Sequence, residues 1–106
     1  PMLGQHHQFH HYNSGKSEFG EKRYFKISKR IYTELDERLS KSKFLASDNY
    51  SIADIATFPW IARHEWHDIG LKRYSHLTRW YKQISEREPV KKGYDLLRKG
   101  DIIPKV

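Results

Sequence analysis

The 106-residue sequence contains no cysteine, so the chain can form no disulfide and offers no thiol for catalysis. Because disulfides are typical of secreted proteins, their absence leads us to expect a cytoplasmic protein. No apolar run approaches the roughly 20 residues that span a bilayer, so we expect no membrane partner. Proline and glycine are scarce, at 4 and 6 residues, and β-branched runs are missing. These shortages favour helices over strands.

The sequence also lacks a dense block of one charge, although its net charge is +7. The longest adjacent basic runs are pairs, such as Lys29-Arg30 and Lys91-Lys92. Proteins that bind nucleic acid usually gather their basic residues on one arm or face. We therefore expect no nucleic-acid partner. A basic nucleic-acid binder remains an alternative, and it would show a steep salt dependence of DNA affinity.

Helical periodicity runs through the whole chain. Ser17 followed by Glu18 and Glu21 predicts a helix start, and the helix should extend over about 18–40. Its apolar positions step by three or four residues and form one stripe: Tyr24, Ile27, Ile31, Leu35 and Leu39. Residues 1–12 resemble the tail of a helix, and further helices are expected at about 51–66, 75–87 and 89–98. The predicted core comprises Leu35, Leu39, Ile52, Ile55, Leu77, Trp80 and Ile84. The sequence predicts one all-α domain over residues 1–106, a bundle of four or five helices.

Asp54 lies among apolar residues and could be either a catalytic carboxylate or a helix cap. Ser51 and Asp54 stand three residues apart before an apolar run, which is the spacing of a capping box. Tyr50 and Ile55 occupy the positions of a hydrophobic staple. A general base would need a partner acid or nucleophile, and the sequence offers none nearby. We therefore interpret Asp54 as a helix cap, and Pro59 as the cause of a kink in the same helix.

Three stretches resemble one family. "NYSIADIATFPW" (49–60) resembles the helix-capping signature of the C-terminal helical domain of cytosolic glutathione transferases. "RYSHLTRWYKQISEREPVKKG" (73–93) resembles the two helices that follow it in that domain, although Ser75 replaces the expected proline and Glu88 intervenes before Pro89. "PMLGQHHQFHHY" (1–12) is similar to the bacterial nu-class members.

This resemblance implies a longer parent protein that uses glutathione as co-substrate, for disulfide-bond reduction or for transfer to a small electrophile. In that parent the helical domain forms the wall of the electrophile pocket and part of a homodimer interface. The family's thioredoxin-like domain, which activates the glutathione thiol, lies outside this chain. We therefore expect no catalytic residue here and an inactive isolated chain. A non-catalytic protein-interaction module with the same fold remains the alternative.

The resemblance also implies which residues contact glutathione or its partner substrate. Arg23, in "EKRYFK", matches a cationic position of the subgroup, and its guanidinium suits a glutathione carboxylate. The other implied contacts are Tyr24, Gln5, His6, Met2 and Phe9. His6–His10 and His7–His11 are i,i+4 pairs that could bind zinc, nickel or copper, but no carboxylate or cysteine joins them before Glu18. We expect no metal cofactor.

Overall fold

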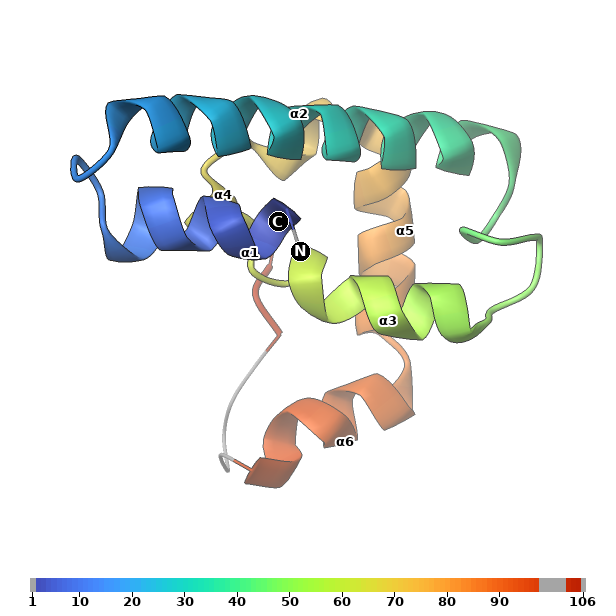
Figure 1. Cartoon of the computed structure of the whole chain (residues 1–106). Coiled ribbons are helices and arrows are strands. Elements are labelled where there is room, and N and C mark those ends of the chain that lie inside the picture. The colour runs from blue at the N-terminus through green and yellow to red at the C-terminus, as the bar shows by residue number, and fades with distance from the viewer. Residues whose placement is uncertain (1, 98–102, 106) are drawn as a thin grey trace.

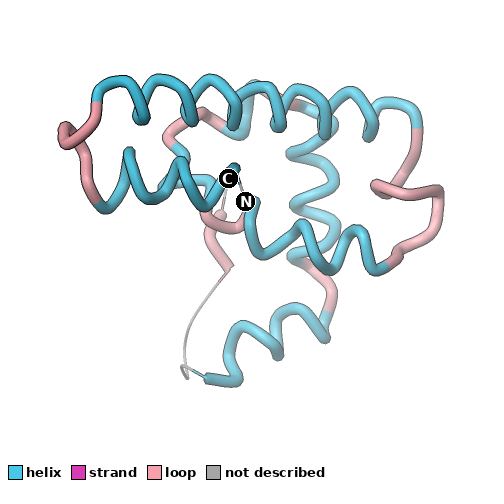
Figure 2. Tube along the Cα trace, viewed as in Figure 1, coloured by secondary structure: helices cyan, strands magenta, loops and turns pink. Residues whose placement is uncertain are grey.

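The computed structural model describes residues 2–97 and 103–105, and the regular secondary structure in this part of the chain consists of helices joined by loops and turns (Figures 1 and 2). The elements are α1 (Met2–His6), the π-helix η1 (His7–Tyr12), α2 (Glu18–Lys41), α3 (Ile52–Ile61), α4 (His64–His67), the 3₁₀ helix η2 (Leu71–Arg73), α5 (Ser75–Ser85) and α6 (Glu88–Leu97). The all-α prediction is confirmed. Six α-helices are present in the described part, because the predicted helix over 51–66 is divided.

The long helix α2 is the spine of the fold. It begins where predicted, because the Ser17 side chain accepts a hydrogen bond from the Gly20 N–H at 3.1 Å. Glu18 and Glu21 occupy the first turn, where the helix dipole favours acids. In Figure 1, α1 and η1 run antiparallel beside the first half of α2, and α5 crosses the second half steeply. The N-terminal segment and α5 therefore pack against different halves of one helix.

The buried face of α2 is rotated relative to the predicted stripe. Ser28, Tyr32 and Leu39 are buried, while Ile31 and Leu35 pack at the margin of the core. Neighbouring apolar residues such as Ile31 and Tyr32 both fit a spacing of three or four residues. Periodicity therefore could not decide which of the two faces inward.

The main core is centred on α5, where Leu77, Trp80 and Ile84 are fully buried as predicted. Phe58 and Ile61 of α3 pack into the same cluster. The prediction that Ile52 and Ile55 belong to the core is wrong, because both side chains are exposed. The helix α3 is apolar on more than one face, so its sequence pattern did not identify the buried side.

The predicted single helix over 51–66 is interrupted after Ile61. Pro59 has no N–H to donate to the carbonyl of Ile55, which weakens the helix at this point. Four residues later the Arg63 N–H bonds the Trp60 carbonyl at 3.2 Å, a tighter turn than the α-helix allows. The chain then starts again as α4, so the proline lies close to a break rather than a simple kink.

The start of α5 is capped by a residue from another helix. The N-cap residue Tyr74 makes no side-chain cap hydrogen bond. Instead, Asp36 of α2 accepts a hydrogen bond from the backbone N–H of Leu77 at 2.9 Å. A carboxylate is well suited to this position, because helix N-termini attract anions. Asp36 thereby fixes α5 against α2.

Candidate functional site

The residues implied to contact glutathione lie on the N-terminal segment and the first turns of α2. The rings of Phe9 and Tyr24 are stacked, with centroids 5.5 Å apart and an angle of 4° between their planes. The exposed Arg23 guanidinium lies 5.7 Å from the centre of the Tyr24 ring. The structure thus brings three of these six residues into one aromatic and cationic surface.

The close approach of the two helices explains the glycine at position 20. A Cβ atom built at Gly20 would lie 3.0 Å from two carbons of the Phe9 ring, tighter than an ordinary contact. Gly20 is buried, so no larger side chain could turn toward solvent at this point. The small residue therefore permits the Phe9–Tyr24 stack.

The other three residues do not share one environment. Met2 and Gln5 are exposed on α1. His6 is fully buried, and its Nε2 donates a hydrogen bond to the carbonyl of His67 at 2.7 Å. A ring held in this way presents no surface to a ligand. The prediction that His6 contacts glutathione is therefore replaced by a structural role.

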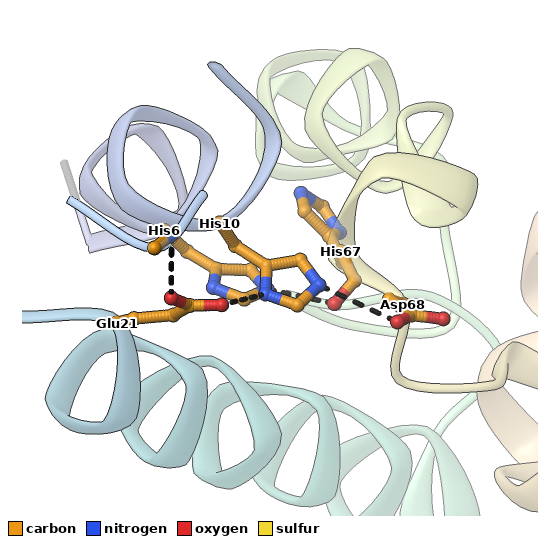
Figure 3. Close-up of polar contacts among 6 residues, drawn as sticks. His6, His10, Glu21, His67 and Asp68 are labelled. Atoms are coloured by element: carbon orange, nitrogen blue, oxygen red, sulfur yellow. Dashed lines mark hydrogen bonds and ion pairs between the residues drawn. The ribbon is translucent and has the colours of Figure 1, made fainter. Parts of the chain in front are cut away.

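His6 belongs to a histidine cluster, which we define as the buried rings of His6, His7 and His67 (Figure 3 shows the first and the last). His7 stacks on His67, with centroids 4.7 Å apart. The Tyr32 hydroxyl donates a buried hydrogen bond to His67 Nδ1. Among the described residues, His6 Nδ1, His7 Nε2 and His67 Nε2 have no hydrogen-bond partner. The cluster joins α1, η1, α2 and α4 at a single point.

Burial is the main reason why the histidine cluster resists protonation. Desolvation, together with smaller contributions from the neighbouring His7 and His6, lowers the pKa of His67 to about 3. Desolvation also lowers the pKa of His6 and of His7. The same burial raises the pKa of Tyr32, which keeps its hydroxyl protonated and able to donate. The rings are therefore neutral near pH 7.

His10 lies at the outer side of the cluster and connects two elements. Its Nδ1 lies 3.1 Å from Glu21 of α2, and its Nε2 lies 3.4 Å from Asp68, which follows α4 (Figure 3). A groove of about 510 Å³ opens beside it on α2, lined by His10, Glu18, Glu21, Lys22, Phe25, Lys26 and Lys29. Glu18 pairs with Lys22 at 2.9 Å, so part of its charge is already neutralised.

The i,i+4 histidine pairs are divided between the interior and the outside of the fold: His6 and His7 are buried, whereas His10 is half-buried and His11 is exposed. Within the described residues, no group of three or more histidine, aspartate or glutamate side chains is placed to hold a metal ion. His6 and His7 are instead committed to packing against α4. The notable arrangement is the burial of these rings, which the spacing alone did not predict.

Asp54 lies in the apolar core and accepts hydrogen bonds from three separate segments. Its Oδ2 accepts from the Ser51 N–H at 3.0 Å, in the capping box. Its Oδ1 accepts from the Leu45 N–H at 3.0 Å and from the Trp80 Nε1–H at 2.8 Å. The carboxylate is fully buried and its oxygens are occupied by these donors. This arrangement describes a structural carboxylate.

The neighbouring residues that are predicted to form a staple lie in different environments. The Tyr50 ring contacts Phe44, with centroids 5.8 Å apart, and the Arg87 guanidinium lies 4.0 Å from its centre. Ile55 is exposed. Tyr50 therefore contacts both the connector and the turn that follows α5, and the Tyr50–Ile55 staple stays a prediction.

Comparisons with known proteins agree with this architecture. Residues 7–88 match the family model described as Glutathione S-transferase, C-terminal domain. The chain is 38% identical over 87 residues to the disulfide-bond oxidoreductase YfcG of Escherichia coli, covering 82% of this chain and 40% of that protein. It is 37% identical over 94 residues to the disulfide-bond oxidoreductase YghU of the same organism, covering 80% and 32%.

A comparison of the three-dimensional fold with a solved structure also points to the glutathione transferases. A glutathione transferase from Burkholderia graminis, crystallised with two glutathione molecules bound per subunit, superposes with a TM-score of 0.83 at 31% identity. The match covers 94% of this chain and 45% of that one. The chain therefore belongs to the glutathione S-transferase C-terminal domain family. It spans less than half the length of these relatives. In the described residues, no helix is long and apolar enough to cross a membrane.

Proposed function

We propose that this chain is the helical half of a cytoplasmic glutathione-dependent disulfide-bond oxidoreductase or transferase. In that protein it forms a wall of the pocket for a small electrophile or disulfide, and part of a homodimer interface. Two relatives named as disulfide-bond oxidoreductases and one glutathione-bound structure support this proposal. Family membership supports the fold, whereas the activity of the whole protein rests on the likeness to these relatives.

The observation that carries the proposal is the surface made by Arg23, Tyr24 and Phe9. Glutathione has two carboxylates, and a guanidinium can pair with a carboxylate through two parallel hydrogen bonds. Arg23 is exposed and therefore available for such a pair, and its guanidinium lies 5.7 Å from the Tyr24 ring of the Phe9–Tyr24 stack. Met2 and Gln5 are exposed on the same N-terminal segment and complete the proposed contact set. His6 is not included, because it is buried.

The outer face of α3 supports a two-domain organisation. Ile52, Ile55 and Trp60 are 80%, 54% and 44% exposed, and Pro59 is exposed beside them. These positions follow helical spacing, so they form one apolar stripe. Contiguous exposed apolar surface usually marks a contact with another protein surface. We propose that the thioredoxin-like domain expected outside residues 1–106 covers this stripe.

The isolated chain should not reduce disulfides. The chain contains no cysteine, and the secondary structure of residues 2–97 is helical, so this part of the chain provides no thioredoxin-like site to activate a glutathione thiol. The contribution proposed for this chain is to bind and orient glutathione and its partner substrate. A binding measurement is therefore more informative than an activity assay.

Arg23→Ala tests the proposed site in a titration of the ¹⁵N-labelled chain with glutathione disulfide, followed by NMR. We expect chemical-shift changes centred on Arg23, Tyr24 and Phe9, and weaker binding for the variant by about tenfold, because one charge-assisted carboxylate contact is lost. Arg30→Ala is the matched control, since Arg30 is an exposed arginine of the same helix.

Equal losses in both variants would reduce Arg23 to a contributor of general positive charge. Shifts confined to other surfaces would contradict the proposed site. Absence of any binding would favour the alternative function, an interaction module that uses the apolar stripe of α3 to dock a protein partner.

A further inference from the structure

The histidine cluster holds together elements that are distant in the sequence. His6 and His7 belong to the N-terminal segment (residues 2–12), whereas His67 ends α4. The centroids of the His6 and His67 rings are 5.9 Å apart, and those of His7 and His67 are 4.7 Å apart. Rings this close and this buried can pack while neutral. Positive charges on them would be desolvated and would repel each other.

The hydrogen bonds of the cluster also depend on neutral rings. His6 donates through Nε2–H to the His67 carbonyl, so a second proton must go to Nδ1, which has no partner among the described residues. In the neutral His67 tautomer that carries its proton on Nε2, Nδ1 accepts a hydrogen bond from the Tyr32 hydroxyl. A proton on this nitrogen would reverse the bond and leave the Tyr32 O–H without its acceptor.

The charged groups around the histidine cluster do not offset the cost of a positive charge on its buried rings. On the N-terminal segment, His10 and His11 are further bases, and Arg63 and His64 on the side of α4 are also basic. Tyr32 on α2 and Tyr74 beside it supply hydroxyls only. The nearby acids are Glu21 of α2 and Asp68 after α4, and both contact His10 at the outer side. Both acids raise the pKa of His6, but desolvation is the larger effect, so that pKa stays below its ordinary value.

His10 contacts both acids from the margin of the cluster, and its side chain and that of Glu21 are 24% and 25% exposed. A charged His10 would pair with both carboxylates, yet the Asp68 side chain is 76% exposed. Exposed pairs contribute little to stability and are screened by salt. The inner rings therefore determine the response of this region to acid.

We propose that the histidine cluster is an acid-sensitive latch, which holds the N-terminal segment against α2 and α4 while its rings are neutral and releases it when they are protonated. Leu77, Trp80 and Ile84 of α5 are fully buried in a cluster to which, among the described apolar residues that are buried, the N-terminal segment contributes Leu3 alone. Release therefore leaves the remainder of the bundle folded. This proposal concerns the fold alone, so it does not depend on whether the chain binds glutathione.

The direction of the pH effect follows from the burial of the rings. All three have a pKa below that of a histidine in an unfolded segment, which is about 6.5. The latched state therefore binds fewer protons than the released state. Its stability is fully present above about pH 6.5 and is lost progressively as the pH falls below that value.

Amide hydrogen exchange of the ¹⁵N-labelled chain at pH 7.5 and 5.5 tests the latch, after correction for the intrinsic exchange rate. We expect the protection of amides in residues 6–12 to fall by about tenfold for each ring that takes up a proton, and by up to about 1,000-fold for three rings. The amides of residues 77–84 in α5 should keep their protection. Parallel loss in both segments, or no loss in the first, would overturn the proposal.

His7→Phe identifies the rings as the cause. Phenylalanine keeps an aromatic ring against His67 and Trp66, and no partner is recorded for the His7 Nε2 atom that it removes. We expect the acid-induced loss of protection to shrink by about tenfold. His76→Gln, at an exposed histidine of α5, is the control and should leave the loss unchanged.

A second variant replaces the imidazole of His67, at the end of α4, instead. Tyr32→Phe combined with His67→Phe deletes both partners of the buried hydrogen bond, which leaves neither group unpaired. This double variant should also reduce the acid-induced loss of amide protection in residues 6–12. An acid response that equals wild type in both the His7 variant and the double variant would refute the latch.

Discussion

Replacing Asp54 by alanine should be among the most damaging single changes in this protein, although the residue performs no chemistry. The carboxylate is fully buried and accepts hydrogen bonds from Ser51, Leu45 and Trp80. Alanine would remove the acceptor and leave three N–H donors behind. The lost contacts belong to the start of α3, to the connector before it and to α5, so three parts of the fold are affected together.

The magnitude follows from the burial of each donor. The Trp80 indole is fully buried and cannot find water, so its unpaired N–H should cost about 2 kcal/mol. Leu45 and Ser51 lie nearer the surface, and their N–H groups should cost about 1 kcal/mol each. We therefore expect Asp54→Ala to lower the free energy of unfolding by about 4 kcal/mol. A domain of this size is typically stable by about 5–15 kcal/mol, so the variant lies close to the folding threshold.

Urea unfolding at pH 7, followed by circular dichroism, measures this difference. Asp54→Asn retains the shape and one acceptor oxygen, and it should cost about half as much. Asp48→Ala is the control: Asp48 also accepts a backbone N–H, from Lys43, but it is exposed and should cost less than about 1 kcal/mol. The reasoning would be refuted if Asp54→Ala and Asp48→Ala unfolded at the same urea concentration.

Two further predictions concern helix packing. Gly20→Ala should lower the free energy of unfolding, measured with urea, by about 1–3 kcal/mol, because the new methyl group meets the Phe9 ring. The control Gly93→Ala, with open space around its Cβ, should raise that free energy by up to about 1 kcal/mol. A stabilising effect of Gly20→Ala would contradict the packing argument. Asp36→Ala should lower the free energy of unfolding by about 1–2 kcal/mol, because the Leu77 N–H at the start of α5 loses its acceptor. A melting temperature equal to that of the wild type would show that this cap is dispensable.

Much of the fold could be predicted from the sequence because its helix signals are local. Ser17 with its following acids predicted the start of α2, and the periodicity of α5 predicted three of its buried residues. The outcome was poorer for α3, where apolar residues lie on several faces. Burial there depends on which face meets α5, and no local pattern contains that information.

The candidate site likewise contains some features that the sequence predicted and others that it did not. Arg23 and Phe9 were predicted from the family resemblance, and the structure brings both to Tyr24, while their contact with glutathione stays a prediction. The histidine cluster could not be predicted, because His6 and the carbonyl that it contacts are 61 residues apart. Asp36 was missed for a similar reason, since it caps a helix that starts 39 residues later. Neither pairing leaves a signal in local spacing.

The three hydrogen bonds of Asp54 also imply an order of events during folding. They close loops of very different size, because the partners lie 3, 9 and 26 positions from Asp54 in the sequence. Closing a short loop costs less chain entropy than closing a long one. The contact with Ser51 can therefore form early and the contact with Trp80 only after α5 has docked. A late contact mainly slows unfolding, so the indole hydrogen bond should set how long the native state persists rather than how fast it is reached.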